Sequence, residues 1–170
     1  FHINYVRNKT NYGNISANTN HALRHADGDI LKVLFSDDFI LTRTLTEDLH
    51  KAFKLDVDWA VTWFAHTLDN GQTHYNPKVP VWNDRLLEGV NTLSSPSILA
   101  LRKGIEEYFD EELVMLMDCD MYYRLYRDHG QPAVIKTYHI SNREHPNQTQ
   151  RQYEDLLPKE IEYLKEKHSS

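Results

Sequence analysis

The sequence contains one cysteine, Cys119, which excludes a disulfide within the chain and suits a reducing compartment. It has no apolar run close to the ~20 residues that a membrane-spanning helix requires. Lys and Arg (19) are fewer than Asp and Glu (25), so the net charge of −6 gives no general attraction for nucleic acid or anionic lipid. We therefore expect a soluble, cytoplasmic protein that binds no nucleic acid and needs a local device, such as a metal ion, to hold a phosphate-bearing ligand.

Glycine is also scarce, with six residues, and none belongs to a glycine-rich loop that could hold a phosphate. The 170 residues, 40% apolar and 26% charged, suffice for one compact globular domain. The chain starts at Phe1 rather than at a methionine, with no signal segment before an alternating Phe1, Ile3, Tyr5 pattern. We therefore expect that upstream sequence is missing.

The order of predicted elements indicates an α/β fold. The alternation at residues 1–5 predicts a strand, and residues 16–26 predict a helix. Residues 30–35 form an almost continuous apolar run, which is typical of a strand buried on both faces, so strand, helix and strand together predict a parallel pair. The remaining predicted elements are a helix over 42–53, a strand over 57–67, a loop over 68–82, a short strand over 98–101, a helix over 111–127, a strand over 133–138, and an amphipathic helix over 153–168 interrupted near Pro158.

Asp37 and Asp38 directly follow the buried run, and ligands of open α/β sheets bind at the carboxyl ends of strands. Two carboxylates suit a hard divalent cation, Mg²⁺ or Mn²⁺, that bridges to substrate phosphates. Neighbouring side chains in extended backbone point to opposite faces, so one of the pair is expected to contact the metal directly. The alternative is that both only mark the turn and cap a helix.

Asp118 and Asp120 lie in the otherwise apolar segment 115–123, where carboxylates require compensation. Two helical positions that are two residues apart point about 200° apart, so one acid should face a cleft and the other a partner such as Arg124 or solvent. A carboxylate in partly apolar surroundings is a reasonable general base, because burial raises its pKa. The alternative is a structural ion pair.

Weaker candidates surround these acids. His145 lies in a polar loop after the last predicted strand and is a possible metal ligand. The aromatic rings of Trp82, Tyr75 and His74 could stack on a sugar, although core packing is the more frequent role of such rings.

Three groups of residues, taken in order, resemble inverting family 2 glycosyltransferases of GT-A fold. Residues 11–30 are similar to the family's turn, its Asn-bearing helix and the glycine that leads into its next strand. Residues 34–38 are similar to an acidic metal-binding motif, although Phe35 and Ser36 occupy the region where a further Asp usually stands. Residues 96–125 are similar to the stretch that supplies the catalytic base, with Met117 where an acid commonly precedes it.

The resemblance implies a GT-A-like, mostly parallel mixed sheet flanked by helices over residues 1–150, and a helical tail over 151–170. The domain would be N-terminally incomplete, because the segment that holds the nucleotide base and ribose has no counterpart. The implied reaction is metal-dependent, inverting transfer of a sugar from a nucleotide-sugar donor to a hydroxyl of a glycan or another acceptor. The implied site comprises Asp118 as base, Asp37, Asp38 and His145 as ligands of Mn²⁺ or Mg²⁺, and Asn20, Ser94, Ser95 and Trp82 around the donor.

Two other classes of function stay open at this level. A metal-dependent phosphoester hydrolase would use the same acids but needs further ligands for a second metal ion. A non-catalytic domain derived from a transferase would retain the acids only as caps and ion pairs.

Overall fold

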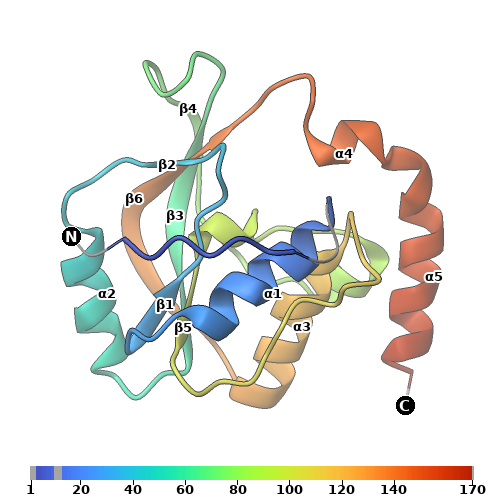
Figure 1. Ribbon diagram of the computed structural model, residues 1–170, viewed down its shortest axis with the longest axis horizontal. Coiled ribbons are helices and arrows are strands. Elements are labelled where there is room, and N and C mark those ends of the chain that lie inside the picture. The colour runs from blue at the N-terminus through green and yellow to red at the C-terminus, as the bar shows by residue number, and fades with distance from the viewer. Residues whose placement is uncertain (1–2, 10–12, 170) are drawn as a thin grey trace.

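The computed structural model describes residues 3–9 and 13–169 and shows a mixed sheet with helices on both faces (Figure 1). The helices and strands are α1 (Ile15–His25), β1 (Ile30–Lys32), β2 (Phe39–Ile40), α2 (Leu45–Phe53), β3 (Trp59–Thr67), β4 (Tyr75–Lys78), β5 (Leu99–Arg102), α3 (Met117–His129), β6 (Ala133–Arg143), α4 (Thr149–Gln152) and α5 (Leu157–Lys167). Short 3₁₀ turns occupy Asp84–Glu88 (η1), Pro96–Ile98 (η2) and Glu154–Leu156 (η3). No helix of the described residues is long and apolar enough to cross a membrane.

The strand order is β1-β5-β3-β6-β2, and β4 pairs with the second half of β3. Within the described chain, β3 and β6 form a parallel pair, whereas the other pairings are antiparallel. The expected α/β sheet with flanking helices is confirmed, but the expectation of a mostly parallel sheet is wrong.

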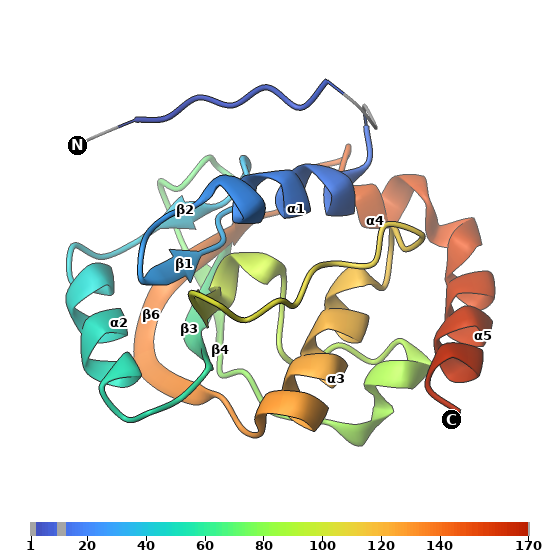
Figure 2. The ribbon, with the colours of Figure 1, turned by 60° about the horizontal axis from the view of Figure 1, so that its bottom comes forward.

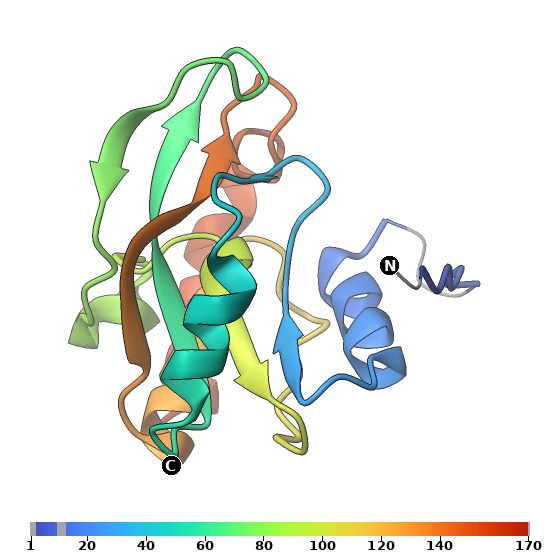
Figure 3. The same cartoon turned by 90° about the vertical axis from the view of Figure 1, so that its left-hand side faces the viewer.

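That error originates at the amino terminus. Residues 3–9 form no strand and run along the outside of α1, away from the sheet (Figure 2), with Ile3 86% and Tyr5 83% exposed. The predicted partner is also shorter than residues 30–35, because β1 has three half-buried residues and pairs antiparallel with β5. The predicted parallel pair is therefore absent from the described residues, and α1 lies beyond the edge strand β1 (Figure 3).

The central strand β3 carries side chains into two cores. Ala60 faces α2, whose Leu45, Leu49 and Phe53 form the buried stripe that their spacing predicts. Trp59 belongs to the larger core on the opposite face, where α3 and α5 pack. This alternation follows from the two-residue period of a strand, and it gives three layers with the sheet in the middle.

The helix predicted over 111–127 begins later, at Met117, and ends at His129. The cause is Glu160 of α5, whose buried carboxylate accepts the backbone N–H groups of Val114 (3.0 Å), Met115 (2.9 Å) and Leu116 (2.8 Å). These donors are held by a side chain from 44 to 46 residues away, so the segment stays non-helical until Met117.

The predicted interruption of the C-terminal helix near Pro158 is confirmed, because the 3₁₀ turn η3 ends at Leu156 and α5 begins at Leu157. Pro158 lies in the first turn of α5, where its missing N–H breaks no helical hydrogen bond. Leu164 of this helix is fully buried in the larger core, and α5 lies at the end of the molecule opposite α2 (Figure 1). The strand predicted over 133–138 is also longer, because β6 continues to Arg143.

Candidate active site

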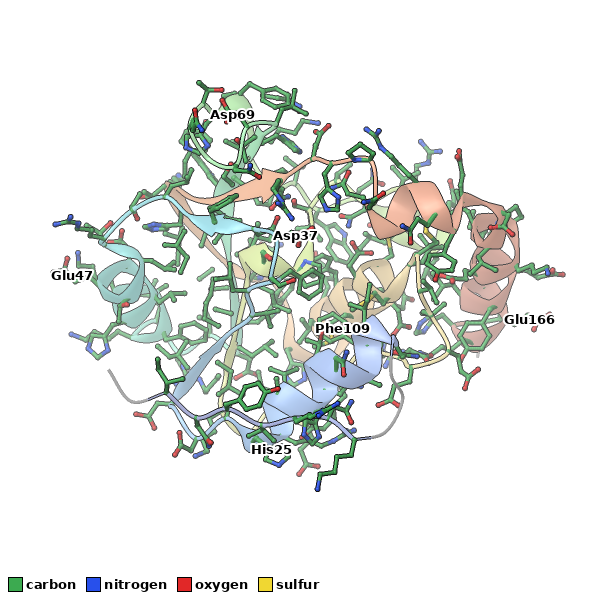
Figure 4. All side chains as sticks on the ribbon, turned by 45° about the horizontal axis from the view of Figure 1, so that its top comes forward. His25, Asp37, Glu47, Asp69, Phe109 and Glu166 are labelled. Carbon is green, nitrogen blue, oxygen red and sulfur yellow. The ribbon has the colours of Figure 1, made fainter. Side chains whose placement is uncertain are left out.

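A cleft of about 1360 Å³ opens between α1, the segment that follows β1, the loop of residues 91–96, the start of α3 and the end of β6. Figure 4 shows Asp37 near the centre of the molecule, whereas Glu47, Asp69 and Glu166 lie at its periphery. Six of the residues singled out from the sequence line this cleft together: Asp37, Asp38, Ser94, Ser95, Asp118 and His145. The early aspartates and the aspartate of the late helix therefore meet in one crevice.

Asp118 lies in the first turn of α3 and is partly buried. Its Oδ2 accepts a 2.7 Å hydrogen bond from Asn91 Nδ2, and its Oδ1 accepts one of 2.7 Å from the backbone N–H of Cys119. Burial outweighs these bonds and raises the pKa of the carboxyl to about 6. A carboxylate of this kind is poised to accept a proton near neutral pH.

Asp120 points the other way, as the helical geometry predicts. Its side chain is fully buried, and its Oδ2 accepts a 2.9 Å bond from Arg124 Nε. Lys167 and His168 of the C-terminal region each lie 2.8 Å from its Oδ1. The prediction that one acid faces a cleft and the other pairs with Arg124 is thus confirmed, and Asp120 ties α3 to the C-terminal end.

Asp37 and Asp38 also diverge. Asp38 Oδ1 accepts the backbone N–H of Arg143 at 3.0 Å and its Oδ2 accepts the Ser95 hydroxyl at 3.2 Å, while burial raises the pKa of this carboxyl. Asp37 is likewise half-buried, and its Oδ2 lies 3.1 Å from Nε2 of His145. Both carboxylate oxygens of Asp38 accept hydrogen bonds from the cleft wall, whereas Asp37 pairs with the imidazole of His145, the side chain that could share a metal ion with it.

Asp37 and His145 are the residues of this cleft that could hold a divalent cation. Within residues 3–9 and 13–169, no three His, Cys, Asp or Glu side chains come together as a closed metal site. The pair Asp37 and His145 supplies one carboxylate and one imidazole, which leaves other coordination positions for water and phosphate oxygens. Such an open arrangement is typical of ions that bind together with a phosphorylated ligand.

The loop of residues 91–95 connects the two halves of the cleft. The Ser95 hydroxyl donates a hydrogen bond to the Asp38 carboxylate, and the Asn91 side-chain amide donates one to the Asp118 carboxylate. Ser94 lies between them with φ of +144°, in a region where residues with a side chain are strained, and its hydroxyl accepts Asn142 Nδ2 at 2.7 Å. The serines are among the residues that the sequence predicts here, whereas Asn91 is not, because no pattern distinguishes it from an ordinary turn residue.

Lys32 also lines the cleft and was not singled out. Its ammonium group donates to the carbonyls of Val33 (2.6 Å) and Ser97, and burial lowers the pKa of this lysine to about 7 while nearby Asp38 opposes the effect. The available signal was a lysine within the apolar run of residues 30–35, where a charged group needs a partner.

Two residues placed near the donor by resemblance lie outside the cleft lining. The Asn20 side chain is buried and bonds both the N–H (2.7 Å) and the C=O (2.7 Å) of Phe109, which fastens α1 to that loop. Trp82 stacks on Tyr126 with ring centroids 3.7 Å apart. Asn20 therefore connects α1 to the loop that contains Phe109. Trp82 packs against Tyr126, which is the alternative role considered for this aromatic residue.

No protein-family model matches the sequence, and no curated protein matches it. The structure is similar to solved structures of S. aureus TarS, a glycosyltransferase. A TarS 1-349 complex with UDP has a TM-score of 0.57 and 23% identity over 92% of this chain and 46% of that chain, and a complex with UDP-GlcNAc has 0.58 and 22% over 83% and 42%. The chain thus spans about half the length of the structures it matches, and the likeness shows a glycosyltransferase-like fold.

Proposed function

We propose that this chain forms the catalytic and acceptor-facing part of a nucleotide-sugar-dependent glycosyltransferase of the inverting, metal-dependent family 2 type. One observation carries the proposal: a carboxylate suited to base catalysis, Asp118, opens onto the same cleft as the possible metal-binding pair Asp37 and His145. The TarS complexes with UDP and UDP-GlcNAc support a uridine diphosphate sugar as the donor.

In this proposal Asp118 accepts the proton of the acceptor hydroxyl as its oxygen attacks the anomeric carbon. The attack comes from the face opposite the leaving diphosphate, so the configuration at that carbon inverts. Asn91 and the Cys119 N–H hold one oxygen each of the carboxylate, which fixes its orientation toward the cleft. The cleft of about 1360 Å³ has room for both a donor sugar and an acceptor.

Asp37 and His145 would hold Mn²⁺ or Mg²⁺ at the diphosphate. When bound, the ion supplies positive charge that offsets the charge of the leaving group. Asp38 acts through hydrogen bonds, because it connects Ser95 of the loop to the backbone of Arg143 at the end of β6. Ser94 and Ser95 form the wall between the base and the metal pair.

The two rival functions are less well supported. A two-metal phosphoester hydrolase needs a cluster of ligands, and the described residues contain no group of three His, Cys, Asp or Glu side chains in metal-binding arrangement. A non-catalytic domain has no need of a strained Ser94 in the cleft wall or of a base whose pKa burial has raised to about 6.

The test is UDP release from UDP-GlcNAc, with and without Mn²⁺, in the presence and absence of oligosaccharide acceptors. Asp118→Asn should abolish release and leave UDP binding intact, whereas His145→Ala should weaken Mn²⁺-dependent UDP binding. The matched control is Glu47→Gln, which changes an exposed carboxylate on α2 to the same kind of amide (Figure 4). Full activity of Asp118→Asn would remove the base from the proposal, and metal-independent activity would remove the metal pair.

A further inference from the structure

Asn91 makes four hydrogen bonds with its side chain, two through each polar atom. Its Nδ2 donates to Asp118 Oδ2 at 2.7 Å and to the carbonyl of Ser94 at 3.1 Å. Its Oδ1 accepts the backbone N–H of Leu93 at 2.9 Å and that of Ser94 at 3.1 Å. Both donor hydrogens and both acceptor positions of the amide are therefore in use.

The Asn91 amide hydrogen-bonds both the N–H and the C=O of Ser94. Ser94 is the residue with φ of +144°. A non-glycine residue keeps such a backbone conformation only where the surroundings impose it. Asn142 of β6 completes the restraint by donating to the Ser94 hydroxyl at 2.7 Å. The next residue, Ser95, then donates its hydroxyl to Asp38 Oδ2.

One chain of contacts thus runs from the base to the opposite wall of the cleft: Asp118, Asn91, Ser94, Ser95, Asp38. We infer that Asn91 is a positioning residue for the transfer reaction, which sets the orientation of the Asp118 carboxylate against the wall that carries Asp38. This inference rests on the proposed function for its role in catalysis, but the coupling between Asn91 and Asp118 can be measured without any activity.

The chemistry of the contact gives a specific signature. An N–H donated to a carboxylate stabilises its charged form, so the Asn91 amide holds the pKa of Asp118 below the value that burial alone would produce. Two titratable groups next to Asp118 lie on its own helix, the Cys119 thiol and the Tyr122 phenol, and burial keeps both protonated at neutral pH. Charged and titratable side chains line the same cleft from other elements: Lys32, Asp37, Asp38, His66, Lys78, Arg143, Glu144, His145 and Arg151.

The experiment is an NMR titration of the Asp118 carboxyl carbon in the wild type and in Asn91→Ala and Asn91→Asp. Asn91→Asp keeps the shape of the side chain but removes the donor and adds a negative charge. We expect the Asp118 titration midpoint to rise by about 1 pH unit or more in Asn91→Asp and by somewhat less in Asn91→Ala. The control is Asn18→Asp, an exposed position of α1 on the same cleft, which should leave the midpoint unchanged.

Kinetics provide the second readout. If transfer is observed, Asn91→Ala should lower kcat about 10²-fold while the KM for the donor stays within about threefold, because orientation of the base and not donor binding is lost. An unchanged Asp118 midpoint in Asn91→Asp would overturn the inference, whatever the activity. Absence of transfer in the wild type together with a shifted midpoint would leave the coupling established and reject the proposed function instead.

Discussion

Replacing Asp118, the proposed base, by asparagine should change the free energy of unfolding relative to the wild type in a way that depends on pH. Asp118→Asn removes a carboxyl group whose pKa burial raises from 3.8 to about 6. A raised pKa means that the ionised form is better tolerated in the unfolded chain than in the fold. The destabilisation is absent below the unfolded pKa and develops as the pH rises toward about 6.

The magnitude follows from these two pKa values. With about 1.4 kcal/mol for each unit, ionisation of Asp118 costs about 3 kcal/mol of folding stability at pH 7.5 and about 1 kcal/mol at pH 4.5. Because the carboxylate reaches the cleft, solvent reduces these values, and we expect a difference of about 1 to 2 kcal/mol between the two pH values. Hydrogen bonds that the amide cannot reproduce shift both values equally and cancel in this difference.

The assay is urea unfolding of the wild type, Asp118→Asn and the exposed control Glu47→Gln at pH 4.5 and 7.5. The free energy of unfolding of Asp118→Asn, minus that of the wild type, should increase by about 1 to 2 kcal/mol from the lower to the higher pH. The Glu47→Gln curve supplies the baseline for changing a carboxylate to an amide. If this difference in the free energy of unfolding stays constant or decreases from pH 4.5 to pH 7.5, the fold does not raise the pKa of Asp118.

Three further predictions concern the rest of the site. The kcat/KM for transfer should fall tenfold for each pH unit below about 6, because protonated Asp118 cannot accept a proton; a flat pH profile would contradict this. His145→Ala should weaken Mn²⁺ binding in the presence of UDP about tenfold or more by calorimetry, and undiminished binding would remove it from the metal pair. Glu160→Ala should lower the free energy of unfolding by about 3 kcal/mol, since three backbone N–H groups lose their acceptor, while Glu160→Gln should lose less; equal stability of Glu160→Ala and wild type would contradict the capping role.

Local periodicity predicted the elements that pack by simple rules. The stripe of Leu45, Leu49 and Phe53 and the strand through Trp59 were recognisable because one core contact surface determines each pattern. The divergence of Asp118 and Asp120 was predictable for the same reason, since helical geometry alone separates them.

Contacts between distant segments explain what the sequence could not predict. The late start of α3 depends on Glu160, and the link between the two halves of the cleft depends on Asn91, neither of which has a local pattern. The antiparallel pairing of β1 was missed because an apolar run does not specify the direction of its neighbour. Asn20 is the opposite case. It matches a motif position expected near the donor, but its side chain hydrogen-bonds the backbone of Phe109.

Whether Asp118 and the Asp37–His145 pair share one nucleotide-sugar site can be tested by a two-dimensional amide NMR titration of this chain with UDP-GlcNAc and Mg²⁺. We expect simultaneous, saturable shifts at residues of the shared cleft, among them Asp37, Ser94, Ser95, Asp118 and His145, with Glu47 and Glu166 unchanged. Shifts confined to one half of this set, or found only outside the cleft, would contradict a single site in which base and metal pair act on the same nucleotide sugar.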